Sequence, residues 1–146
     1  MRYTEGSIGR VFLVKFEHGD DLLGKVKELV VKEDIKLAAI TFIGALSKGD
    51  IVAGPDKLEL PAVPTWISFT DGREVFGSGT IIKEKDEVHL HIHSTLGRGE
   101  EVLTGCLRKN CEVFVTVEAI VTEIQGVKVS RVKDKDTGCN VLEFDQ

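Results

Sequence analysis

Only one long segment of the chain has helical periodicity. In residues 20–35, DDLLGKVKELVVKEDI, charged side chains fall mostly away from a single apolar stripe. The stripe consists of Leu22, Leu23, Val26, Leu29 and Val30. We expect Asp20 to be the N-cap, and Gly24 lowers the helix propensity by up to about 1 kcal/mol without removing the stripe. A chain with one amphipathic helix must build the rest of its core from strands.

Strand-like segments occupy most of the remaining sequence. RVFLVKF at residues 10–16 is rich in strand-forming residues, and turn-forming DGR, KEKD and QG separate the later segments. These later segments are TWISFT, EVFGSGTII, EVHLHIH, EVFVTVEAIVTEI and VKVSRV. Their spacing favours antiparallel pairing. The sequence therefore predicts an α+β fold in which the helix covers one face of a largely antiparallel sheet.

The middle of the chain predicts a central strand followed by an irregular connection. Residues 37–46, LAAITFIGAL, are nearly continuous in small and apolar residues, as in a strand buried on both faces. DIVAG predicts a short further strand, and PDKLELPAVPTW, which contains all three prolines, predicts a loop or irregular edge segment. The 146 residues leave no room for a second domain, so we expect a single domain over residues 1–146.

The composition excludes several classes of protein. Hydrophobic residues make up 42% of the chain and charged residues 29%, as in folded soluble proteins. No apolar run approaches the roughly 20 residues that span a bilayer, and the N-terminus lacks a signal-peptide core, so we expect a cytoplasmic protein without a membrane partner. Three cysteines indicate free or ligating thiols, and the net charge of -5 opposes general attraction to nucleic-acid phosphates.

The segment VHLHIHSTLG, residues 88–97, carries three of the four histidines at every second position. In a strand, the histidines share one face and the apolar residues share the other: His89, His91 and His93 against Val88, Leu90 and Ile92. Alternate residues lie roughly 6.6 Å apart, and two imidazoles at that spacing can tilt onto one ion with Zn–N distances of about 2.1 Å. Two interpretations remain open: a metal or anion site, and a row of histidines that faces water or another subunit.

Cys106, in LTGCLRKNC, is the candidate third ligand. Thiolate joins imidazole in many zinc sites, and Gly105 allows a close approach of the backbone. We expect GRGEE, residues 97–101, to form a flexible loop between the histidine strand and a turn that carries Cys106. A small buried hydrophobe is the alternative for Cys106 and is our expectation for Cys111, near the start of the next strand, and Cys139.

With these motifs placed, the chain resembles the plant and prokaryote conserved (PPC) domain family over nearly its whole length. RVFLVKFEHGDDLLGKV, AAITFIGALSKGDI, EVFGSGTI and EVFVTVEAIV, with Glu118, are similar to successive family segments. HIHSTLG resembles the family's His-x-His segment and places His91 and His93 on its histidines. TGCL stands where the family has Gly-Gly-His-Leu, so Cys106 replaces a histidine that helps to gather a metal in prokaryotic members.

The resemblance implies an α+β fold, a homotrimer and an association with DNA. In plant members, a separate Arg-Gly-Arg-Pro AT-hook precedes the domain and reads the minor groove. This sequence begins at its domain and contains no such hook. We therefore expect a prokaryotic stand-alone member of the family. The association of plant members with DNA is a poor guide to this chain.

The first functional hypothesis is a trimeric binding or regulatory module that holds zinc or a small ligand at His91, His93 and Cys106. We expect His89 to lie beside this site, outside the ligand set that the resemblance implies. The module accounts for the histidine row and for the family resemblance together.

Two alternatives remain open. DNA binding rests on the basic run KVSRVKDK, in which Arg131, Lys133 and Lys135 share a face if the strand persists, although Asp134 and Asp136 dilute the charge. A metal-dependent enzyme of unknown reaction needs a proton acceptor, for which Glu100, Glu101 and Glu118 are available. No catalytic motif singles out a reaction class.

Overall fold

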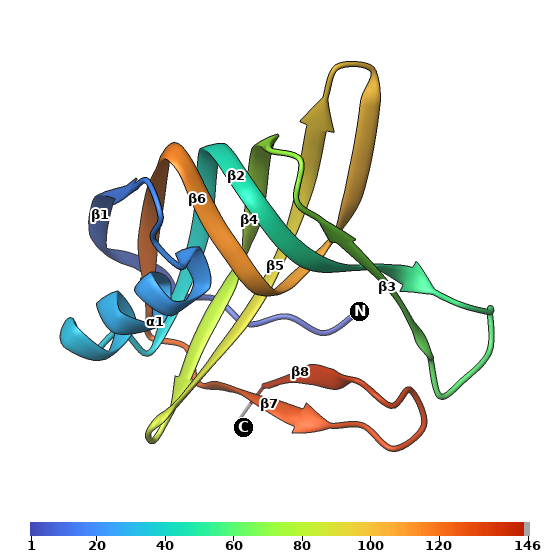
Figure 1. Cartoon of the computed structure of the whole chain (residues 1–146). Coiled ribbons are helices and arrows are strands. Elements are labelled where there is room, and N and C mark those ends of the chain that lie inside the picture. Colours follow the sequence, from blue (N-terminus) through green and yellow to red (C-terminus); the bar gives the residue numbers. More distant parts are fainter. Residues whose placement is uncertain (145–146) are drawn as a thin grey trace.

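The computed structural model describes residues 1–144 and consists of a strongly curved antiparallel sheet with one helix (Figure 1). In chain order the elements are β1 (Ser7–Glu17), α1 (Leu22–Lys32), β2 (Leu37–Pro55), β3 (Pro64–Phe69), β4 (Arg73–Glu84), β5 (Glu87–Arg98), β6 (Glu101–Gln125), β7 (Val129–Lys133) and β8 (Asn140–Phe144). No helix in residues 1–144 is long and apolar enough to cross a membrane. The antiparallel sheet with one main helix is confirmed, although the helix is short and strands dominate the fold.

The sheet closes on itself because β6 pairs with strands on two sides. The second half of β6 pairs with β1, its first residues pair with β5, and β2 pairs along most of its length, from Glu123 to Cys106. Since β2 also pairs with β4 and β4 pairs with β5, these four strands form a hydrogen-bonded ring. β3 pairs with the last part of β2, and β7 and β8 form a separate hairpin.

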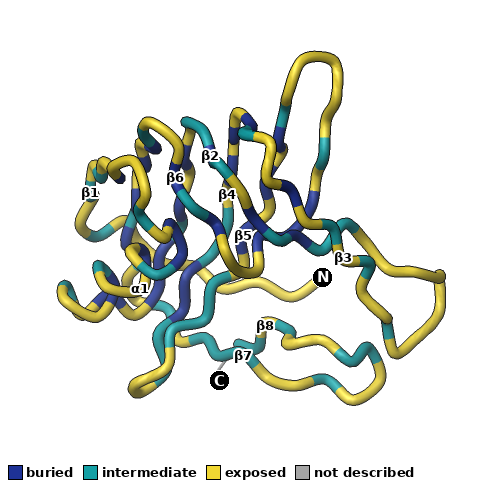
Figure 2. Tube along the Cα trace, viewed as in Figure 1, coloured by how far each residue is buried: buried dark blue, intermediate teal, exposed yellow. Residues whose placement is uncertain are grey.

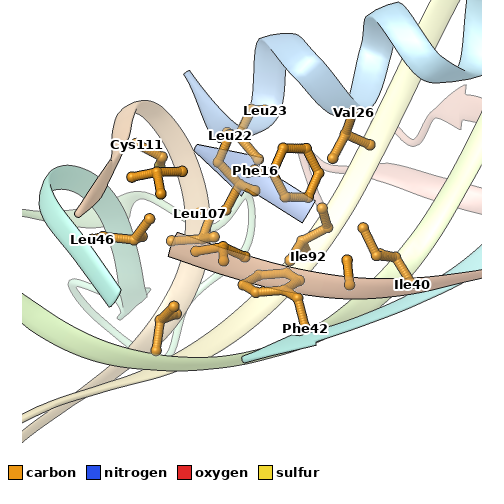
Figure 3. Packing of buried hydrophobic residues seen from close by; sticks show 14 of the residues in the cluster. Phe16, Leu22, Leu23, Val26, Ile40, Phe42, Leu46, Ile92, Leu107 and Cys111 are labelled. Atoms are coloured by element: carbon orange, nitrogen blue, oxygen red, sulfur yellow. The ribbon is translucent and has the colours of Figure 1, made fainter. Parts of the chain in front are cut away.

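The helix α1 supplies one side of the hydrophobic core. The predicted stripe is confirmed, since Leu22, Leu23, Val26 and Val30 are buried and Leu29 packs against the same cluster. Strand residues such as Phe42 and Ile92 meet this stripe from the sheet, as Figure 3 shows. The helix begins one residue later than predicted. Asp21 is the N-cap, and the Asp20 carboxylate instead accepts a hydrogen bond from the Glu17 backbone N–H at 2.9 Å.

The prediction that residues 37–46 are buried on both faces was wrong. Buried and exposed positions alternate along this part of β2, and Ile43 is 56% exposed. Figure 2 shows the same alternation along the neighbouring strands. The helix covers only one face of the sheet, so small and apolar residues also line the outer face. DIVAG is not a separate strand but the continuation of β2, and the proline-rich segment forms the expected connection to the edge strand β3.

The predicted loop at residues 97–101 is a tight turn. β5 continues to Arg98 and β6 begins at Glu101, so only Gly99 and Glu100 connect them. Gly99 has a φ of 60°, a left-handed conformation that glycine adopts without steric cost. As a consequence, Cys106 lies within a strand rather than in a turn, and Cys111 lies inside β6 rather than near its start.

Gly77 in β4 provides a test of how tightly this core is packed. A Cβ atom at Gly77 would meet Cζ of the buried Phe42 ring at 2.1 Å. We expect Gly77→Ala to lower the free energy of unfolding by about 1–3 kcal/mol, because the ring must leave its position. Urea denaturation at a fixed protein concentration measures the change.

Gly97→Ala is the matched control, because a Cβ at this strand glycine would meet nothing within 4 Å. We expect its unfolding midpoint to stay close to that of the wild type. Equal midpoints for both variants and the wild type would contradict the packing of Phe42 on Gly77.

Candidate metal centre

Strand β5 presents the histidines on the outer face of the sheet. Ile92 is buried and Leu90 packs against the core, whereas His91 and His93 are exposed on the opposite face, as strand alternation predicts. In the pairing with β4, His91 lies opposite Thr80 and His93 lies opposite Ser78. The predicted row of histidines is therefore present, with small hydroxyl side chains beside it.

Strand β6 brings Cys106 to the histidines. Cys106 pairs directly with His93 across the β5–β6 ladder, so the two side chains leave the sheet on the same face. Gly105 makes this course of β6 possible, because a Cβ at this position would meet the Val52 carbonyl oxygen at 2.5 Å. Cys106 is only 3% exposed, yet it lies outside the main core cluster.

The donor atoms lie close enough together to surround one ion. The Nε2 atoms of His91 and His93 are 3.2 Å apart, and the ligating atoms of both histidines and Cys106 all lie within 4.8 Å of one another. A tetrahedral zinc with Zn–N of about 2.1 Å and Zn–S of about 2.3 Å needs separations of roughly 3.4 to 3.6 Å. The histidine pair is near this spacing already, and two nitrogens with one sulfur are donors that zinc prefers.

The environment sets the protonation of these donors. Partial burial lowers the pKa of His91, and the positive charges of Arg131, His93 and Arg108 lower it further. A neutral imidazole is the form that binds a metal. Burial raises the pKa of the Cys106 thiol, against the opposing effect of Arg108. The thiol is thus protonated at neutral pH without a metal, and a bound cation would displace its proton.

The third histidine of the row and the other two cysteines lie outside the group of three. His89 is outside the group of three and has Glu87 and Glu84 carboxylate oxygens at 3.8 and 4.0 Å from its ring nitrogens. Cys111 is a buried core residue, as expected, and burial raises its pKa to about 12. Cys139 is exposed, so the expectation that it is buried was wrong.

The three glutamates considered as proton acceptors are not part of the histidine–cysteine group. Glu101 forms an ion pair with Arg73 at 3.1 Å, and Glu100 is exposed in the β5–β6 turn. Glu118 lies in the second half of β6 opposite Ile43 of β2, and β4 lies between β2 and the histidine strand. The structure therefore brings none of the three into the cluster.

Arg131 of β7 is the neighbour that sequence reasoning missed. Its Nη2 atom lies 3.2 Å from His91 Nδ1 and donates a hydrogen bond to Thr80 Oγ1 at 3.0 Å. The basic run suggested a DNA-facing stripe, but β7 ends at Lys133 and does not reach Lys135. Lys133 donates to the Gly138 carbonyl. No local pattern could have revealed the contact of Arg131, because 40 residues separate it from His91.

Comparisons with known proteins agree with this architecture. A metal-containing protein from Archaeoglobus fulgidus is 28% identical with a TM-score of 0.85, over 97% of this chain and 98% of its own. A PPC protein from Pyrococcus horikoshii is 29% identical with a TM-score of 0.84, over 100% and 99%. A candidate DNA-binding protein from Bacteroides thetaiotaomicron is 21% identical with a TM-score of 0.80, over 97% and 99%.

No curated protein matches the chain. The model of one protein family matches residues 3–125, which include β1 to β6 and all three candidate ligands, and ends before β7. Because this match spans most of the sequence, the chain belongs to the Plants and Prokaryotes Conserved (PCC) domain family, the family also abbreviated PPC.

Proposed function

We propose that this protein is a cytoplasmic, single-domain PPC module that binds one transition metal ion, zinc, with His91, His93 and Cys106. The observation that carries the proposal is the 3.2 Å separation of the two Nε2 atoms, with Cys106 paired opposite His93. The name of the A. fulgidus relative, a metal-containing protein, supports the same function. Binding or regulation is the role proposed for the module, and none of the three glutamates considered as proton acceptors belongs to the cluster.

Each candidate ligand residue has its own role in this function. His91 and His93 provide neutral nitrogen donors, and Cys106 provides a sulfur donor whose proton leaves when the ion binds. Three protein ligands would leave one position of a bound zinc open to a small ligand, toward which the ion would act as a Lewis acid. Thr80 and Ser78 line the same face and can donate to or accept from that ligand.

Metal content tests the proposal. We expect protein purified without an affinity tag or added metal to contain about one zinc per chain by elemental mass spectrometry. His91→Ala and Cys106→Ala should each lose most of this metal, because a two-ligand site binds zinc far more weakly.

His89→Ala is the matched control, since His89 lies on the same strand but outside the group of three. It should keep the wild-type metal content. A wild-type protein that contains no transition metal and takes up none on titration would refute the metal site.

The quaternary structure belongs to the same proposal: three copies of the chain assemble through the outer face of the sheet. Apolar side chains line this face although they are exposed in one chain, among them Leu13 at 83%, Ile43 at 56% and Phe76 at 55%. Register places Ile43 next to Phe76, beside a hollow that Thr95 and Glu118 also line. Contiguous exposed apolar surface of this kind is typical of subunit interfaces.

A charge on the outer face tests the assembly. We expect the wild type to sediment as three chains of 16.0 kDa each. Phe76→Glu should shift the protein toward a single chain, because assembly would bury an unpaired carboxylate. Leu58→Glu, at a fully exposed residue between β2 and β3, should leave the mass unchanged. A wild-type mass of one chain would overturn the trimer.

Duplex DNA is the second candidate partner, and the name of the B. thetaiotaomicron relative is the observation that favours it. This candidate predicts binding that persists near 0.15 M salt, about the physiological ionic strength, and weakens as salt rises. Fluorescence anisotropy of a labelled duplex measures it. Lys133→Gln with Lys135→Gln should weaken binding more than Lys57→Gln. A protein that binds no duplex even at low salt would exclude DNA.

A further inference from the structure

Arg131 connects the C-terminal hairpin to the candidate metal centre. Its backbone N–H donates to a Glu84 carboxylate oxygen at 2.5 Å, which fixes the middle of β7 against the end of β4. From there the guanidinium reaches across β4 to β5, where Nη2 contacts both Thr80 Oγ1 and His91 Nδ1. Arg131 therefore touches one of the three candidate ligands directly.

The contact with Arg131 dictates where the proton of a neutral His91 ring lies. A guanidinium has only donors, so His91 Nδ1 must accept the hydrogen bond at 3.2 Å. The ring proton is then on Nε2, where it can be donated to His93 Nε2, also at 3.2 Å. In the metal-free protein, the hydrogen bonds of Arg131, His91 and His93 thus form one consistent chain.

A metal ion on His91 Nε2 is incompatible with this arrangement. Nε2 must give up its proton to bind the ion, and a neutral ring then carries its proton on Nδ1. Two donors, His91 Nδ1–H and the Arg131 guanidinium, would face each other. Arg131 must consequently leave His91, and one of its N–H groups loses its acceptor beside the metal centre.

A second arginine makes this region more positive. Arg108 lies two residues beyond Cys106 on β6, hence on the same face of the strand, and its charge acts on both His91 and Cys106, as that of Arg131 does. The acidic group in contact with Arg131 is Glu84, whose carboxylate accepts a hydrogen bond from the Arg131 backbone N–H. The single negative charge of a Cys106 thiolate would not neutralise the combined positive charge of a zinc ion and two arginines.

We propose that Arg131, once a metal displaces it from His91, binds an oxyanion, the carboxylate or phosphate group of a small ligand, that also occupies the open position of the metal. The planar fork of a guanidinium matches both groups with two parallel hydrogen bonds. This inference rests on the proposed metal site and names the class of ligand for it. The family-model match ends at residue 125, so Arg131 belongs to a part of the chain outside it.

The test uses full-length protein loaded with Co²⁺, whose visible absorption reports on the metal's ligands. Inorganic phosphate and acetate are titrated separately, and binding is followed by absorption and by calorimetry. We expect the loaded wild type to bind at least one of the two anions, and whichever binds more tightly identifies the oxyanion. Arg131→Gln should weaken that binding by about tenfold or more, as loss of a charge-assisted hydrogen bond implies, with cobalt uptake retained.

Three comparisons make the result specific. Arg98→Gln removes an equal charge at the end of β5, near Asp71, and should bind the anion as the wild type does. Arg131→Lys keeps the charge without the fork and should give intermediate affinity, which also covers the case that Arg131→Gln fails to fold. The metal-free wild type should bind the anion at least about tenfold more weakly, because His91 then holds Arg131.

The outcomes separate this inference from the function on which it rests. Cobalt uptake together with equal anion affinity in Arg131→Gln and the wild type would overturn the role of Arg131 and leave the metal site standing. Cobalt uptake without binding of either anion would do the same. A wild type that takes up no cobalt or zinc would overturn the metal site and the anion site together.

Discussion

The double pairing of β6 is the constraint on which the rest of the structure depends. Its second half lies between β1 and β2, and its first half remains paired with β2 and also reaches β5, which positions Cys106 opposite His93. In a strand, a shift of one residue turns every side chain to the other face. A slip of the β5–β6 register by one residue would therefore point Cys106 into the core and leave two histidines without a third donor.

Local patterns predicted those features that depend on periodicity alone. The stripe of α1 and the alternation of His91 and His93 with Ile92 follow from residue spacing, and the structure has both. The run of apolar residues in β2 led to the wrong prediction that both of its faces are buried. Ile43 is apolar like a core residue, but it lies on the face that the helix does not cover. An apolar side chain is expected to be shielded from water, but the sequence does not tell whether residues of the same chain or of another subunit shield it.

Features that depend on tertiary pairing were beyond the sequence. Nothing near Cys106 indicates that it lies in a 25-residue strand, since the turn residues around it resemble those of a loop. The contact of Arg131 with His91 spans 40 residues and depends on how the β7–β8 hairpin docks on β4. The sequence therefore supplied the three candidate ligands but not the cation beside them.

The local charge of the site differs in sign from that of the whole chain. The chain carries a formal net charge of -5. The charges that act on both His91 and Cys106, however, are the positive charges of two arginines, Arg108 and Arg131. A divalent cation entering this region would be repelled by both arginines, and the proposed oxyanion between metal and guanidinium would offset that repulsion. Because coupling between two ligands is reciprocal, an anion that binds more tightly to the metal-loaded protein would raise the affinity for the metal by the same factor.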